Sequence, residues 1–298
     1  MREHFEPACN AAIGQIQKNA ILMAAAELNV RGGIKDRKLE PILADTKGNP
    51  DGGRAAIRTL IQTDSVPVIG GGFSSTVTWA AITIAQKNKI SFLVNSAAAD
   101  KITEQGWEYI FRLNQPISER LDALVSFLSS VATDVRSVAI VYVNSLEYSA
   151  DARRFFKKAA ERGLKPVIRE GFDSGTVDFR PLLTRVKAKN PDLIYVAADN
   201  AKGAALLVRQ SRELKLNPKL FVGGGNSFVQ PDFATHAGQA SGHIVCTANW
   251  TPTVPYRGAG TFNEKFVARY KTPPNHYAAE AYAGISVIAD ALKRTKRL

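Results

Sequence analysis

Short runs of consecutive apolar residues alternate along this chain with longer segments in which apolar residues recur every three or four positions. Continuous apolar runs are typical of strands buried on both faces, and the longer periodic segments of amphipathic helices. Alternation of the two predicts parallel α/β layers. Predicted strands are Leu39–Ala44, Val66–Ile69, Ile90–Val94, Tyr109–Leu113, Ser137–Val143, Lys165–Glu170, Asp192–Ala197, Leu220–Gly223 and His243–Thr247. Predicted helices include Ala11–Asn29, Gly52–Gln62, Arg120–Ala132, Ala150–Arg162, Phe179–Lys189, Ala201–Lys215, Thr261–Tyr270 and His276–Lys293.

Two of the predicted strands end in turns of small residues that lead into helical segments. Val66–Ile69 is followed by the turn Gly70–Thr76, and Ile90–Val94 by Asn95–Ala98. Free N–H groups at a helix start attract anions, and the serine hydroxyls add short hydrogen-bond donors. Neither turn carries a general base, a thiol or a set of metal ligands. The pair of turns therefore indicates a site that binds a small anion without converting it.

The two series of strands and helices are separated near Asn114–Pro116. Ligands of open parallel sheets lie outside the carboxyl ends of the strands. Two lobes that face each other through these ends would form a cleft, which is a common location for small-ligand sites.

The net charge of +12 makes nucleic acid a partner to consider. The basic residues, however, are spread over the predicted helices, and only Lys293–Arg297 forms a run. No recognition helix, zinc-finger spacing or aromatic-basic RNA motif accompanies them. We expect a solvated basic surface and no nucleic-acid partner, with attraction to acidic surfaces as the alternative.

Metal, cofactor and membrane functions find little support in the sequence. Cys9 and Cys246 are far apart, and the four histidines lack the spacing of metal ligands, so we expect no metal and no cofactor. No run of about 18 apolar residues is present to span a membrane. Met1–Pro7 lacks the basic start and apolar stretch of a secretory signal. Either the protein is cytoplasmic or its leader lies outside this sequence.

A larger set of short motifs recurs in a recognisable order. They are Gln17–Asn19, Ala26–Asn29, Gly32–Ile34, Asp45, the Gly71–Ser75 turn with Ala80, Asn95–Ala98, Gly106–Arg112, Val138–Tyr142 with Tyr148, Asp178–Phe179, Asp192–Tyr195 and Tyr282. In order and spacing the chain resembles the periplasmic substrate-binding proteins of branched-chain amino acid ABC transporters, the leucine/isoleucine/valine-binding type. The resemblance extends from about Gly14 to Leu292.

The resemblance implies an α/β protein of two doubly wound lobes with parallel central sheets, the type I periplasmic-binding fold. Residues 1–115 and 248–298 would form the N-terminal lobe and residues 116–247 the C-terminal lobe. We expect the chain to lack the family's first strand and its C-terminal segments. The family's function implies a periplasmic, monomeric binding protein for an amino acid or a small carboxylate, with the membrane permease of an ABC transporter as its partner.

The resemblance also assigns roles to individual residues. Ser74 and Ser75 would receive the ligand carboxylate, together with the Ala98 backbone N–H. The Ser96 carbonyl would accept from the ligand ammonium, and Tyr148 would close over the ligand from the second lobe. Asp199 follows a predicted strand at a ligand-facing position. The expected ligand-binding residues are Ser74, Ser75, Ser96, Ala98, Tyr148, Asp199, Asn226 and Tyr282.

Departures from the family pattern leave the ligand open. Ala98 stands where a threonine or serine is frequent, and Gly224–Asn226 where leucine binders have an acidic ammonium partner. Asp199 is the candidate replacement for that charge. Each site residue also has a structural alternative: helix capping for the serines and Asp199, turn formation for Asn226, and core packing for Tyr282.

Two other functions remain to be weighed. A cytoplasmic amide or carboxylate sensor of the same fold fits the missing leader. A doubly wound enzyme does not fit, because the turns lack the GxGxxG fingerprint, the nucleophile elbow and the Walker loop. We therefore expect no catalytic residues.

Overall fold

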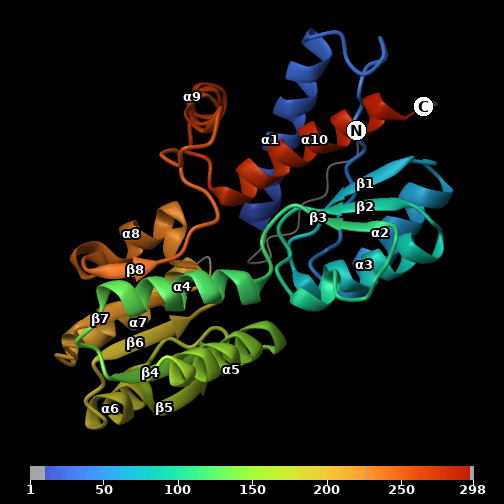
Figure 1. Ribbon diagram of the computed structural model, residues 1–298. Coiled ribbons are helices and arrows are strands. Elements are labelled where there is room, and N and C mark those ends of the chain that lie inside the picture. The colour runs from blue at the N-terminus through green and yellow to red at the C-terminus, as the bar shows by residue number, and fades with distance from the viewer. Residues whose placement is uncertain (1–10, 226, 296–298) are drawn as a thin grey trace. The chain divides into compact units, whose positions relative to one another are not determined.

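The computed structural model describes residues 11–225 and 227–295, in which helices alternate with parallel strands (Figure 1). The strands are β1 (Val68–Gly71), β2 (Ser91–Val94), β3 (Ile110–Arg112), β4 (Ser137–Val143), β5 (Lys165–Phe172), β6 (Leu193–Ala197), β7 (Leu220–Gly224) and β8 (Ile244–Cys246). The α-helices are α1 (Ala11–Val30), α2 (Pro50–Gln62), α3 (Ser75–Lys87), α4 (Ile117–Val131), α5 (Leu146–Glu161), α6 (Arg180–Ala188), α7 (Ala201–Glu213), α8 (Pro231–Ala237), α9 (Ala259–Tyr270) and α10 (His276–Arg294). Short 3₁₀ helices are η1 (Asp100–Ile102), η2 (Ser227–Val229) and η3 (Gly238–Ser241).

The chain divides into two compact units. One comprises the described residues up to Pro116 together with those from Asn249 onward, and the other is Ile117–Ala248.

The sheet of the first unit is parallel, with the order β1-β2-β3 in its described part. Successive residues of β1 point to opposite faces. Ile69 joins the apolar cluster of α2 and α3, whereas a Cβ on Gly70 would lie 2.8 Å from Ile288 Cδ1 of α10. Helices therefore cover both faces, as a doubly wound sheet requires.

The predicted strand Leu39–Ala44 is wrong. These residues have no regular secondary structure and pair with no strand in the part of the protein that the structure describes. Pro41 removes a backbone donor from the middle of the run. Ile42 and Leu43 are both exposed, so the segment does not bury the apolar residues from which a strand was predicted.

The sheet of the second unit is parallel throughout, in the order β5-β4-β6-β7-β8. Helices cover both faces of β4. Ala139 packs in the apolar cluster of α6, α7 and α8, and Ile140 packs in that of α4 and α5. The central strand β6 is buried at every residue. Parallel strands buried on both faces confirm the predicted α/β class and explain the continuous apolar runs in the sequence.

Candidate functional site

The two small-residue turns lie side by side, because β1 and β2 are paired neighbours whose carboxyl ends meet at one edge of the sheet. Backbone bonds hold the turns together. The Asn95 N–H donates to Gly71 O at 2.8 Å, and the Ser96 and Ala97 N–H groups both donate to Gly72 O, at 3.1 and 3.0 Å. The sequence prediction of adjacent turns is thereby confirmed.

Ser74 and Ser75 begin α3 in different environments. Ser74 precedes the helix, and its carbonyl accepts from Thr78 N–H at 2.8 Å, but its half-buried hydroxyl makes no capping bond. Ser75 is only 5% exposed, and its Oγ accepts from the Ala99 N–H at 3.2 Å. The Ser75 hydroxyl thus ties the first turn to the second. The N–H groups of the first helical turn have no intrahelical acceptors, which leaves partial positive charge at this point.

Ser96 is buried and is held by two residues that the sequence analysis missed. Gln17 Nε2 of α1 donates to Ser96 Oγ at 3.2 Å, and Asn114 Nδ2 donates to the Ser96 carbonyl at 2.9 Å. A carbonyl oxygen has two lone pairs, so the Ser96 carbonyl retains a second acceptor position. A signal for Gln17 was available, because it lies four residues after Ile13 and three before Ala20 in the apolar stripe of the predicted helix.

Ala98 is a buried residue whose backbone N–H has no hydrogen-bond acceptor among the described residues. The residue is 6% exposed. The N–H groups on either side are engaged, that of Ala97 by Gly72 O and that of Ala99 by Ser75 Oγ. Among the described residues, no acceptor is bonded to the Ala98 N–H. Buried backbone donors are nearly always paired with protein or solvent, so the Ala98 N–H is available to an acceptor from outside the described residues.

In the second unit, Tyr148 lies half-buried in the first turn of α5, beside the glycine pair that ends β7. A Cβ on Gly225, whose φ is +77°, would lie 3.0 Å from Tyr148 Cε1. A Cβ on Gly224 would lie 2.1 Å from the Tyr195 hydroxyl. A side chain at Gly224 would overlap the Tyr195 hydroxyl, and one at Gly225 would require a small shift of Tyr148 and a left-handed backbone, so both positions suit glycine.

Asp199 follows β6 and is exposed. Its carboxylate accepts from Ser174 Oγ at 2.7 Å and from Asn200 Nδ2 at 2.8 Å. The alternative role that the sequence suggested, capping of α7, belongs instead to Asn200, whose Oδ1 accepts from Gly203 N–H at 2.7 Å. The structure thus frees the Asp199 carboxylate from a capping role. Asn226 lies outside the described residues.

Tyr282 lies between α10 and α1. Its hydroxyl donates to Glu27 Oε2 at 2.8 Å, and its ring packs 4.8 Å from that of Phe262. Burial, followed by the bond to Glu27, raises the pKa of Tyr282 to about 12. The aromatic residue of α10 that contacts the first turn is Tyr277, whose buried ring meets Phe73 edge-on at 5.0 Å. The core-packing alternative for Tyr282 accounts for these contacts.

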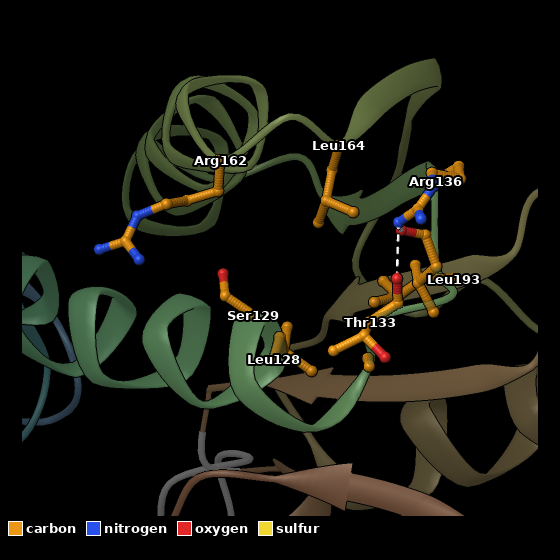
Figure 2. Close-up of a pocket in the computed structure, with 9 residues that line it drawn as sticks. Leu128, Ser129, Thr133, Arg136, Arg162, Leu164 and Leu193 are labelled. Atoms are coloured by element: carbon orange, nitrogen blue, oxygen red, sulfur yellow. Dashed lines mark hydrogen bonds between the residues drawn. The ribbon is translucent and has the colours of Figure 1, made fainter.

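A pocket of about 200 Å³ in the second unit lies away from all these residues (Figure 2). Its lining includes Leu193, the first residue of β6, and Arg136, which precedes β4, so it lies at the amino ends of the strands. Tyr148 and Asp199 follow the carboxyl ends. Arg136 Nη1 donates to Thr133 O at 2.6 Å, which engages this guanidinium with the end of α4. None of the predicted site residues lines this pocket.

Other chemistry is sparse in the described part of the chain. No group of histidine, cysteine or acidic side chains there is arranged to hold a metal ion. No described helix is both long and apolar enough to cross a membrane. Burial raises the pKa of the Cys246 thiol, which disfavours the reactive thiolate. Cys9 lies outside the described residues.

Comparison with known proteins identifies the family. The family described as periplasmic binding protein matches residues 9–298. The chain belongs to this family. Among its curated relatives, the Leu/Ile/Val-binding protein homolog 7 of Brucella abortus is 27% identical over 304 residues, covering 96% of this chain and 74% of the relative.

Solved structures of the family share the fold. The branched-chain amino acid substrate-binding protein LivJ of Streptococcus pneumoniae, in complex with isoleucine, matches with 26% identity and a TM-score of 0.85, covering 96% of this chain and 81% of that one. A solute-binding protein of an R. palustris ABC transporter, in complex with benzoate, matches in fold with 20% identity and a TM-score of 0.83, covering 96% and 78%. The family and the type I fold expected from the motif order are confirmed.

Proposed function

We propose that this periplasmic binding protein is the solute-binding component of an ABC transporter and captures an amino acid or a small carboxylate. One observation carries the proposal: the N–H of the buried residue Ala98, which no other described residue accepts, lies in the turn that Ser75 ties to the amino end of α3. Converging N–H groups at a helix start suit a carboxylate, since they supply hydrogen bonds and positive potential together.

The second lobe supplies the remaining contacts. We assign residues 1–115 with 248–298 to the N-terminal lobe and residues 116–247 to the C-terminal lobe. Tyr148 covers the ligand, and the exposed Asp199 carboxylate accepts its ammonium, since Gly224 and Gly225 offer no acidic side chain. Contact with one ligand from both lobes favours a closed state, since only differential contacts shift such an equilibrium.

The ligand class depends on whether the ligand carries an ammonium group that can pair with the Asp199 carboxylate. The isoleucine complex of LivJ and the benzoate complex of the R. palustris protein show that carboxylates with and without an ammonium occur among similar folds. If Asp199 contacts the ligand, an amino acid is favoured over a simple carboxylate, because an unpaired carboxylate beside the ligand would repel a simple carboxylate.

The same family membership supports the partner and the location. Relatives named as ABC transporter substrate-binding proteins favour a transporter over the alternative, a cytoplasmic sensor of the same fold. We place the protein in the periplasm as a non-enzymatic monomer that presents its ligand to a membrane permease and binds no nucleic acid.

Isothermal titration calorimetry against a panel of amino acids and aromatic carboxylates tests the proposal. Ser75→Ala removes a hydroxyl from the carboxylate site, so we expect the affinity to fall by about 1–3 kcal/mol, the range for a hydrogen bond to a charged group. Ser130→Ala is the matched control, because the exposed Ser130 hydroxyl donates only to Phe127 O of its own helix. No heat from any panel member with a folded sample would refute the proposal, and binding of uncharged ligands alone would refute the anion site.

A further inference from the structure

Arg112 is bonded to the outer side of the second turn. It is the last residue of β3 and is paired with Val94, the last residue of β2, so its backbone lies next to the start of the turn. Its side chain is half-buried and runs along the loop that follows Ala98.

The Arg112 guanidinium donates hydrogen bonds to four residues of this loop. Nη1 lies 3.4 Å from Ala97 O, and Nη2 lies 2.8 Å from Ala99 O and 3.1 Å from Asp100 O. Nη2 also lies 2.8 Å from Thr103 Oγ1. Arginine suits such a set because its planar group presents five donors in a fixed arrangement, whereas lysine offers one compact ammonium.

These bonds fix which backbone groups of the turn remain free. The carbonyls of Ala97 and Ala99 are engaged by Arg112, and their N–H groups by Gly72 and Ser75. The Ala98 N–H, between them, is left without an acceptor among the described residues. With its neighbours bonded on both sides, the peptide that carries this donor is held in one orientation.

The three alanines at the start of the 97–103 loop supply no side-chain hydrogen bonds of their own. Ala97, Ala98 and Ala99 have no polar side-chain atoms, so the loop is anchored by its backbone and by groups from other segments.

We propose that Arg112 is a positioning residue for ligand binding. Its guanidinium holds the 97–103 loop so that the Ala98 N–H is oriented for the ligand carboxylate before binding, and it adds positive charge behind that donor. Preorganised donors bind more tightly because the ordering cost is met before the ligand arrives. The assignment rests on the proposed function, since it presupposes a carboxylate at Ala98.

Arg112→Gln and Arg112→Lys separate the positioning effect from the charge. The matched controls are Arg185→Gln and Arg185→Lys. Arg185 is also half-exposed and makes three bonds in the other unit, two to the Glu170 carboxylate at 3.0 and 2.9 Å and one to Pro181 O at 3.3 Å. The probes are L-isoleucine and benzoate in calorimetry. A second readout is hydrogen exchange of the 97–99 amides without ligand, which a general loss of stability would not raise selectively.

We expect Arg112→Gln to weaken binding about tenfold or more, equivalent to at least about 1.4 kcal/mol, and to speed exchange of the 97–99 amides selectively. Arg112→Lys should recover only a minor part of both effects, and the Arg185 variants should change neither. Full recovery by lysine, or equal behaviour of the Arg112 and Arg185 variants, would overturn the assignment while the proposed function stands. If Arg112→Gln fails to fold, the affinity and the amide exchange of Arg112→Lys alone test the assignment. A wild-type protein that binds neither probe nor any other panel carboxylate would overturn both proposals.

Discussion

At the scale of single residues, a few buried polar atoms account for both the binding chemistry and the electrostatics of this protein. The Ala98 N–H is one, and the carboxyl of Asp151 is another. Asp151 is completely buried, and its Oδ2 accepts from the Tyr195 hydroxyl at 2.9 Å. Its Oδ1 has no hydrogen-bond partner among the described residues. Burial raises the pKa of Asp151, although the nearby Arg120 charge and the bond from Tyr195 oppose the shift.

The raised pKa makes the stability of the protein depend on pH in a defined direction. A carboxyl whose pKa is higher in the folded state stabilises the fold fully below its unfolded pKa and loses that contribution as pH rises through the folded pKa. We expect wild type, relative to Asp151→Asn, to lose unfolding free energy as the pH rises from about 4, the usual pKa of aspartate, toward the raised pKa of Asp151. For each pH unit between the unfolded and the folded pKa, the unfolding free energy should fall by about 1.4 kcal/mol. Urea unfolding of both proteins across this pH range measures the loss.

Asp192→Asn provides the control for this experiment. Hydrogen bonds from the Arg136 backbone, Ser137 and Lys219 lower the pKa of Asp192 despite some burial. Its contribution is therefore present above its unfolded pKa and is lost only as pH falls through its lower folded pKa, so it should stay constant from pH 5 to 8. A difference between wild type and Asp151→Asn that is equally flat would contradict the burial argument.

At the scale of elements, the sequence predicted most helices and strands because their apolar periodicity is local. The run Ile90–Val94 and the turn Asn95–Ala98 could be found this way. Leu39–Ala44 could not be judged, because an apolar run indicates a strand only if another strand pairs with it. The Arg112 contacts were equally beyond the sequence, since they join residues 9 to 15 positions apart across two elements. The Gln17–Ser96 bond spans 79 positions.

The end of β7 provides a test of close packing between elements. Gly224→Ala places a methyl group where the Tyr195 hydroxyl lies, 2.1 Å from the Cβ position. Overpacking of this kind costs about 1–3 kcal/mol of unfolding free energy. Tyr195 is fully buried and stacked on Phe155 at 3.8 Å, so it has little room to move.

Gly260→Ala in α9 is the matched control, because no atom lies within 4 Å of the added Cβ. Alanine is the better helix former there, so this variant should be neutral or gain about 0.5–1 kcal/mol. Denaturant unfolding compares the two variants with wild type. If Gly224→Ala were as stable as wild type, the Tyr195 side chain would be able to move aside. A larger side chain at position 224 would then not be sterically excluded.

At the scale of the whole molecule, the proposed function requires one ligand to contact residues of two units with separate cores. The proposed carboxylate donors at Ser75 and Ala98 belong to the first unit, and Tyr148 and Asp199 belong to the second. A ligand that contacts only one unit cannot shift the equilibrium between open and closed arrangements, however tightly it binds. Affinity and closure are therefore separate properties, and variants in the two units should affect them differently.

Small-angle X-ray scattering distinguishes the two properties. At saturating isoleucine or benzoate, whichever calorimetry shows to bind, we expect the radius of gyration of wild type to decrease. Ser75→Ala should need roughly 5 to 150 times more ligand, which corresponds to its predicted loss of about 1–3 kcal/mol, but should contract equally once saturated. Tyr148→Ala removes one of the two contacts proposed for the second unit, so it should bind with reduced affinity and contract less even at saturation. A wild-type protein that binds the ligand in calorimetry yet keeps an unchanged radius of gyration would contradict closure. Equal contraction of Tyr148→Ala and wild type would show that Tyr148 does not drive it.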